Sequence, residues 1–207
     1  MIFLNIKTIQ KKITNRIPGP TRIQSYYSVL IPIIEIDDKL NLIYELRASN
    51  LSTQPGQISF PGGKVERGEE FSQAAVRECA EELLIEQEKI KLLGEIDYLI
   101  TPFDFIIYAF IGCLKLNSLS EIKTNNEVAE VFNVPLEYFL DHEPEKYGAY
   151  FKSEFDTDFP YHLLPEGKNH KKLRSEYYIY FYRYQNRVIW GITAELTKNF
   201  IDILKNK

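Results

Sequence analysis

The sequence has little cysteine and lacks any long apolar run. Only two of its 207 residues are cysteine, and Cys79 and Cys113 do not have the spacing of metal ligands. Two reduced thiols are therefore favoured over a disulfide. The apolar start, Met1–Ile6, is too short for the core of a signal peptide, and no stretch approaches the ~20 apolar residues of a membrane span. We expect a cytoplasmic protein with no membrane partner.

The sequence also lacks an excess of charge of one sign. Lys and Arg number 25 and Asp and Glu number 29, so the net charge is −4. This balance gives no sign of a polyanion-binding protein, and we expect no nucleic-acid partner. Hydrophobic residues make up 44% of the chain, which is typical of a globular protein. The length suits one domain with a sizeable core.

The apolar pattern alternates between helical and strand spacing. Isoleucines at helical spacing predict an amphipathic helix in an N-terminal extension, residues 1–20, that ends near Pro18. The main domain, residues 21–207, is predicted to be an α/β sandwich, with an irregular segment at 147–172 and Trp190 and Leu204 in its core. Its predicted strands are 26–36, 40–46, 57–60, 92–100, 105–114, 127–134, 177–184 and 187–190, and its predicted helices are 70–86, 135–141 and 193–205.

The helix after Gly63 carries Glu78, Glu81 and Glu82 on one face. Residues three and four apart in a helix are neighbours, so these carboxylates repel one another. A folded chain gains nothing from that crowding, whereas a hard cation such as Mg²⁺ does. Cys79 lies on the opposite, apolar side, so the acidic and core faces are predicted to overlap little. An ordinary solvated acidic helix is the alternative.

This segment resembles the Nudix box, G-x5-E-x7-R-E-U-x-E-E-x-G-U, in which U is a bulky aliphatic residue. Cys79 is smaller than the usual U residue, and Leu84 stands where the pattern has glycine. Glycine at that position eases the chain into a left-handed cap, so we expect the helix to run on or to exit differently. The residues in register are Gly63, Glu69, Arg77, Glu78, Glu81, Glu82 and Ile85.

The resemblance implies a Nudix fold, a mixed β-sheet sandwich flanked by helices, and hydrolysis that depends on Mg²⁺ or Mn²⁺. Glu78 and Glu82 are the first choice as metal ligands, and Glu81 is either a ligand or the base. Arg77 is expected to orient a carboxylate by a bidentate pair, and Glu69 to hold Arg77 or to cap the helix. The base differs among members of the family, so the roles of Glu81 and Glu82 stay open.

Glu127 and Glu130 precede a Val-Pro-Leu segment, where some family members place a further metal ligand or base. We take Glu127 as the candidate. The alternative for both residues is an ordinary surface position on a strand.

The residues upstream of the box resemble the extended signature of the coenzyme A diphosphatase branch, in 46–51 and 55–63. The resemblance implies that the substrate is coenzyme A or a derivative, cut to 3′,5′-ADP and 4′-phosphopantetheine or its acyl form. An arginine fork suits phosphate, and backbone N–H groups of a glycine-rich turn bind it. A surface salt bridge or satisfied turn groups are the alternatives. The substrate-binding candidates are Arg47, Gln57, Ser59, Gly62 and Gly63.

A basic cluster near the C-terminus has two interpretations. His170, Lys171, Lys172 and Arg174 either meet the 3′-phosphate of coenzyme A or form a solvated charge run. The open alternatives for the function are hydrolysis of NADH, ADP-ribose or a nucleoside triphosphate, and a Nudix-fold module that binds a nucleotide without turnover. The intact set of glutamates argues against the module. A homodimer is compatible with all of these.

Overall fold

The computed structural model describes residues 5–167 and 174–206. Its first long element is the predicted hairpin, formed by β1 (Ser25–Ile36) and β2 (Lys39–Arg47). The strands pair antiparallel, with Ile36 opposite Lys39. Asp37 and Asp38 both have positive φ, which matches the tight turns whose twist suits paired strands. The hairpin prediction is confirmed.

A mixed eight-stranded sheet is built on this hairpin. β1 pairs in parallel with β7 (Phe105–Leu114), and the central strand order is β3-β2-β1-β7-β5. β4 pairs with β1, β6 with β7 and β8 with β2, all antiparallel. The remaining bounds are β3 Ile58–Ser59, β4 Gly62–Lys64, β5 Ile90–Glu95, β6 Leu99–Ile100 and β8 Val128–Pro135.

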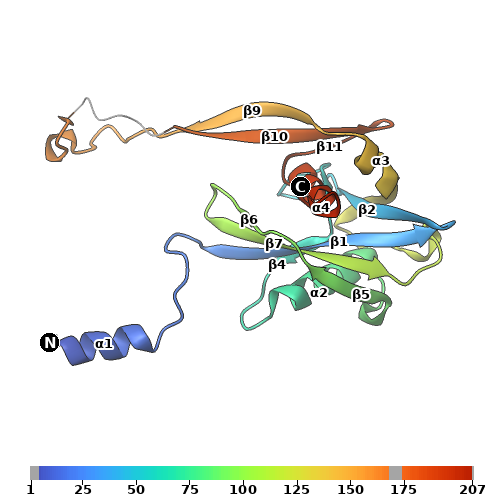
Figure 1. The fold of residues 1–207 in the computed structure, drawn as a ribbon, viewed down its shortest axis with the longest axis horizontal. Coiled ribbons are helices and arrows are strands. Elements are labelled where there is room, and N and C mark those ends of the chain that lie inside the picture. The colour runs from blue at the N-terminus through green and yellow to red at the C-terminus, as the bar shows by residue number, and fades with distance from the viewer. Residues whose placement is uncertain (1–4, 168–173, 207) are drawn as a thin grey trace.

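Helices cover both faces of this sheet (Figure 1). α2 (Phe71–Leu83) covers one face, and α4 (Gly191–Leu204) covers the other. Leu30 and Leu83 belong to the apolar cluster on the α2 side, and Tyr44 and Phe200 to the cluster on the α4 side. Burial on both faces explains why the central strands are apolar along most of their length. The predicted sandwich of a mixed sheet flanked by helices is confirmed.

A second, antiparallel sheet lies on the α4 side (Figure 1). It consists of β9 (Glu145–Lys152), β10 (Arg174–Tyr184) and β11 (Arg187–Trp190), in the order β11-β10-β9. The predicted hairpin of β10 and β11 is confirmed. The prediction of an irregular segment from 147 was wrong, because β9 pairs with β10 along its whole length. A short helix, α3 (Leu136–Asp141), follows β8 as predicted.

Several predicted details of burial and length were also wrong. The predicted strand 92–100 is two strands, β5 and β6, that pair with different parts of β7. Trp190 is 40% exposed and Leu204 is exposed, so neither belongs to the core. Both cysteines are free thiols; Cys79 is buried, whereas Cys113 is only half-buried. The short 3₁₀ turns are Gln87–Lys89, Leu119–Glu121 and Tyr161–Leu163.

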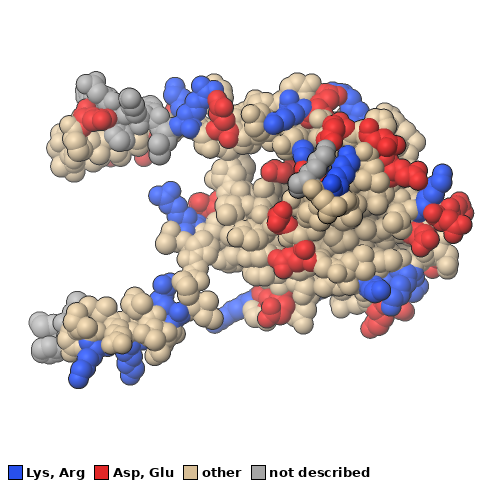
Figure 2. Space-filling model, in the orientation of Figure 1, with Lys and Arg blue, Asp and Glu red and all other residues tan. Residues whose placement is uncertain are grey.

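The predicted N-terminal helix is α1 (Ile6–Thr14), which ends before Pro18. The Asn5 side chain caps it by accepting a hydrogen bond from the Thr8 N–H at 2.9 Å. None of its residues is buried, and it lies apart from the sheets in Figure 1. Figure 2 shows basic but no acidic side chains on its visible face, and the basic residues of this helix are lysines. The division into 1–20 and 21–207 stays a prediction. Along the described parts of the chain, no helix has the length and apolarity needed to cross a membrane.

The exit of α2 differs from the prediction that it would run on to residue 86. The helix ends at Leu83, and Leu84 adopts the left-handed conformation with φ 47° and ψ 46°. The N–H groups of Leu84 and Ile85 both donate to the Ala80 carbonyl, which closes the helix. Leucine therefore takes the conformation for which glycine is the usual residue, and this conformation is strained for an L-amino acid.

Replacing Leu84 by glycine should stabilise the protein. Leu84 is 53% exposed, so little packing is lost, and relief of the left-handed strain should raise the free energy of unfolding by about 1 kcal/mol. Urea denaturation measures this change. Leu93→Gly is the matched control, since Leu93 is also 53% exposed but lies in β5 without a positive φ. That control should lose stability, and a loss in both variants would contradict the account.

Candidate active site

Arg77 joins the loop before α2 to two carboxylates of the helix, Glu78 and Glu81. Its Nε and Nη2 donate to the two Glu69 oxygens at 2.8 and 3.0 Å, so Glu69 holds Arg77, which was one of its two predicted roles, and the bidentate pair forms with Glu69 rather than with Glu81. Its Nη1 donates to Glu78 at 2.7 Å and to Glu81 at 3.3 Å. Nη2 also reaches the Lys64 carbonyl of β4 at 3.3 Å. The hydrogen bond from Arg77 lowers the pKa of Glu69.

Glu82 lies on the other side of this helix from Arg77. Its side chain is buried between α2 and the sheet, and its Oε2 accepts a hydrogen bond from the Gly62 N–H at 2.8 Å. Burial raises the pKa of Glu82, and the charge of Glu45 raises it further. The prediction of separate acidic and core faces was therefore wrong, because Glu82 belongs to both.

The two glycines of the box permit close approach of β4 to its neighbours. A Cβ on Gly63 would lie 2.3 Å from the carboxyl carbon of Glu78, and one on Gly62 would lie 2.6 Å from the Ser28 carbonyl oxygen. Glu78 is half-buried beside this backbone, and its pKa is raised by burial in spite of Arg77. Space therefore requires glycine at position 62, where the contact is with backbone, whereas the contact at position 63 is with the end of a side chain.

Glu45 on β2 was missed by the sequence analysis. It is fully buried, and its Oε1 accepts a hydrogen bond from the Ser59 hydroxyl at 2.8 Å and lies 4.0 Å from Arg47 Nη1. Its Oε2 has no hydrogen-bond partner. Burial raises the pKa of Glu45. The sequence did contain a sign of this residue, because strand alternation puts Glu45 on the same face as Arg47, in a strand that is otherwise apolar at its centre.

A cavity of about 1,080 Å³ unites most of the predicted site residues. Glu78, Glu82 and Glu127 line it, together with Arg47. Glu81 does not; its side chain is 57% exposed and pairs with Arg77. The other predicted residues on the wall are Gln57, Ser59, Gly62 and Gly63, and the apolar part of the wall includes Tyr27, Phe60, Leu99, Phe103, Tyr177 and Trp190.

Backbone contacts hold the two ends of the cavity wall together. The Arg47 N–H donates to the Gln57 carbonyl at 2.9 Å, so the loop before β3 is fixed to the end of β2. The Ala48 N–H donates to the Glu127 carbonyl at 2.8 Å, which fixes the residue before β8 to the same strand. Glu127 is exposed, and its charge contributes to the raised pKa of Glu78.

The other charged residues that the sequence analysis singled out either form ion pairs or lie outside the described residues. Glu130 forms an ion pair with Arg187, with oxygen–nitrogen distances of 2.6 and 3.2 Å, as expected for a surface position. Arg174 pairs with Glu176 at 3.2 Å and lies over the Tyr150 ring. The rest of the predicted basic cluster, His170, Lys171 and Lys172, lies outside the described residues.

The carboxylates of the site are suitable ligands for a divalent cation, although their oxygens are not grouped around a common point. Among residues 5–167 and 174–206, no group of three or more His, Cys, Asp or Glu side chains is close enough to hold a metal ion as it stands. Repulsion among Glu45, Glu78, Glu82 and Glu127 nevertheless contributes to the raised pKa values of the first three. Oxygen donors with uncompensated negative charge are what Mg²⁺ and Mn²⁺ bind.

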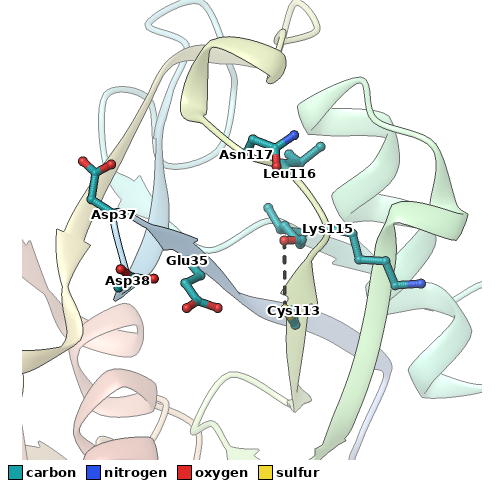
Figure 3. Close-up of a pocket in the computed structure, with 8 residues that line it drawn as sticks. Glu35, Asp37, Asp38, Cys113, Lys115, Leu116 and Asn117 are labelled. Atoms are coloured by element: carbon teal, nitrogen blue, oxygen red, sulfur yellow. Dashed lines mark hydrogen bonds between the residues drawn. The ribbon is translucent and has the colours of Figure 1, made fainter.

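A second hollow, of about 590 Å³, lies at the turn between β1 and β2 (Figure 3). Glu35 and Asp37 line it, and Figure 3 shows their carboxylates pointing apart. The dashed line in that view is the weak hydrogen bond from the Cys113 thiol to the Leu114 carbonyl at 4.0 Å. No residue of this hollow lines the larger cavity, and we assign it no function.

Comparisons with known proteins agree with this geometry. A family model described as the NUDIX domain matches residues 27–155. The chain is 30% identical over 183 residues to NudL, a Nudix hydrolase of Photorhabdus laumondii, and covers 86% of each protein. It is 31% identical over 139 residues to the peroxisomal coenzyme A diphosphatase NUDT7 of Mus musculus, covering 67% of this chain and 58% of that one.

A solved structure supports the fold alone. The crystal structure of a MutT/nudix family protein from Enterococcus faecalis matches with a TM-score of 0.51 and 13% sequence identity. The match covers 96% of this chain and 69% of that chain.

The two glycines of the box should respond differently to alanine. Gly62→Ala should lower the free energy of unfolding by about 1–3 kcal/mol, because its new methyl group meets the fixed Ser28 backbone. Gly63→Ala meets only the end of the flexible Glu78 side chain, which can swing away, so stability should change little. Thermal unfolding of both variants checks this order. Equal losses would show that the contact with Glu78 is as rigid as the backbone contact.

The stability of the metal-free protein should fall as pH rises. Burial and repulsion raise the pKa of Glu45 and of Glu82 above their unfolded values, so protonation favours folding. That contribution is complete below the unfolded pKa of about 4.5 and is lost as pH rises through the raised values, so the window is about pH 5 to about pH 9. Tm measured across this window should decrease, and less steeply in Glu82→Gln. A flat or rising Tm in the wild type would rule out the repulsion.

Proposed function

This chain belongs to the Nudix hydrolase family, and on that premise we propose that its substrate is coenzyme A or a derivative. Members of the family hydrolyse diphosphate bonds of nucleoside diphosphate derivatives. The products here would be 3′,5′-ADP and 4′-phosphopantetheine or its acyl form. The upstream residues 46–51 and 55–63 and the similarity to the mouse coenzyme A diphosphatase support this choice of substrate.

One observation carries the proposal: Glu78 and Glu82 line the same cavity as Arg47 and a wall of apolar side chains. A substrate with a charged diphosphate between organic groups needs such a site, with oxygen donors at one end and apolar surface at the other. Arg47 supplies the cation for a phosphate, since its guanidinium suits phosphate oxygens and its Nε has no hydrogen-bond partner.

We assign the divalent ion, Mg²⁺ or Mn²⁺, to Glu78 and Glu82, with Glu81 as a further candidate. When bound, such an ion polarises a phosphoryl oxygen and lowers the pKa of a water molecule. The residues around it act by position. Arg77 holds Glu78 against β4, Glu69 fixes the direction of Arg77, and the Gly62 N–H fixes Glu82.

Glu127 is our choice for the group that takes a proton from the attacking water. It lines the cavity and is exposed, so it can exchange protons with solvent. Glu81 is less suited because it does not line the cavity. Ser59 is bound to Glu45 through its hydroxyl, and this contact favours a supporting role for Ser59 over direct substrate binding. Gln57 and the backbone of Gly63 remain substrate contacts in this proposal.

We also propose that the protein acts in the cytoplasm, where the free thiols of Cys79 and Cys113 would stay reduced. A homodimer and the lack of a nucleic-acid partner stay predictions. Light scattering of the purified protein tests the first, and a gel-shift titration tests the second.

Mass spectrometry of the products tests the function directly. Incubation with coenzyme A and Mg²⁺ or Mn²⁺ should yield 3′,5′-ADP and 4′-phosphopantetheine. Glu82→Gln should reduce turnover at least about 100-fold, because a site that stabilises developing charge loses that much when one group is removed. Circular dichroism should show an intact fold in this variant, and near-normal turnover would remove Glu82 from the mechanism.

Parallel incubations separate the alternative functions. NADH, ADP-ribose and deoxynucleoside triphosphates are tested under the same conditions. Cleavage of one of these without cleavage of coenzyme A would keep the family chemistry and reject the proposed substrate. Thermal stabilisation by a nucleotide without any product after long incubation with metal would instead favour a module that binds without turnover.

A further inference from the structure

Glu45 is an anionic residue buried where the fold gives it few partners. It lies on β2, outside the box, and none of its side chain is exposed. The Ser59 hydroxyl donates a hydrogen bond to Oε1 of Glu45, and the Arg47 guanidinium lies 4.0 Å away. The second oxygen, Oε2, is buried without a hydrogen-bond partner. A buried carboxylate left in this state is costly, so a purely structural role explains it poorly.

Glu45 lies one side chain away from the cavity that contains the carboxylates assigned above to the cation. Strand alternation directs its side chain to the same face of the sheet as Ile43, which packs in the cluster on the α2 side. The hydroxyl that donates to Glu45 belongs to Ser59 and the nearest cation belongs to Arg47, and both of these residues line the cavity. Glu82 lines the cavity, whereas Glu45 does not. Glu45 therefore occupies a layer behind the wall, where its charge reaches the cavity but its oxygens do not.

We propose that Glu45 is a positioning residue of the cation site, whose buried charge and unpartnered oxygen behind the cavity wall tighten the binding of a divalent ion. The inference rests on the proposed function only in assigning the ion to Glu78 and Glu82. Its physical basis is that a buried negative charge acts across low dielectric and is screened little by solvent. The positive ion offsets the repulsion that the metal-free protein tolerates at this place.

A structural role for Glu45 makes the opposite prediction about stability. If Glu45 served only to anchor Ser59 of β3, its replacement by glutamine would weaken that contact and lower Tm. If Glu45 serves the cation site, the same replacement removes a repelling charge, so metal-free Tm should stay equal or rise. The structural role thus predicts a lower metal-free Tm for Glu45→Gln, whereas the role at the cation site predicts an equal or higher one.

The test is Mn²⁺ binding to metal-free protein, measured by isothermal titration calorimetry or by electron paramagnetic resonance of free Mn²⁺. Glu45→Gln should weaken Mn²⁺ binding by about 10–100-fold, the range seen when outer partners of metal ligands are lost. Metal-free Tm should not fall. Unchanged Mn²⁺ affinity, or a lowered Tm with unchanged affinity, would overturn the proposal.

Two control variants make the result specific. Glu35→Gln removes an exposed carboxylate from β1, outside the cavity, and should leave Mn²⁺ affinity within about twofold. Ser59→Ala removes the hydroxyl contact but keeps the charge of Glu45, and should weaken Mn²⁺ binding far less than Glu45→Gln. Equal effects of Ser59→Ala and Glu45→Gln would show that the hydrogen bond, not the charge, matters.

The binding measurement also separates this inference from the proposed substrate. Mn²⁺ binding that depends on Glu45 in a protein that does not cleave coenzyme A would support the inference and reject the substrate. A wild-type protein that binds no Mn²⁺ would overturn both the assigned cation site and the role of Glu45.

Discussion

Repulsion among glutamates that converge from α2, β2 and the start of β8 is the constraint on which this site depends. Arg77 relieves part of it by binding Glu69, Glu78 and Glu81 together. Because Arg77 also reaches the Lys64 carbonyl, the same side chain fixes the loop before α2 to β4. The Glu82 carboxylate accepts its hydrogen bond from the Gly62 N–H instead, and the charge of Arg47 offsets part of the repulsion there.

The backbone around the box is shaped to keep these carboxylates close. Gly62 lets β4 lie against β1, and Gly63 leaves room for the Glu78 carboxylate. Buried Glu45 adds charge from below the wall, while Arg47 on the same strand presents a cation to the cavity. A site of this kind keeps metal-free protein in a state of electrostatic strain that a bound divalent cation would relieve.

The sequence predicted the parts of the fold that local patterns decide. The hairpin at Asp37 and the helix after Glu70 follow from apolar periodicity, and the pairing of Glu69 with Arg77 from spacing in the box. The burial of Glu82 was not predictable from a helical wheel, because the sheet that covers it comes from distant residues. Strand β9 was missed since its side chains are mostly exposed and its pairing with β10 is long-range.

The end of the helix at Leu84 was mispredicted because leucine disfavours the left-handed conformation. The hydrogen bonds that close the helix nevertheless hold Leu84 in it. Glu45 was overlooked although its strand alternation with Arg47 was visible.

The most direct test of the cation site is the anomalous scattering of Mn²⁺ in soaked crystals of the wild-type protein. We predict an anomalous peak for a Mn²⁺ ion that is bound by carboxylate oxygens of Glu78 and Glu82. A peak elsewhere, for example beside Glu35, or none at these carboxylates would contradict the account.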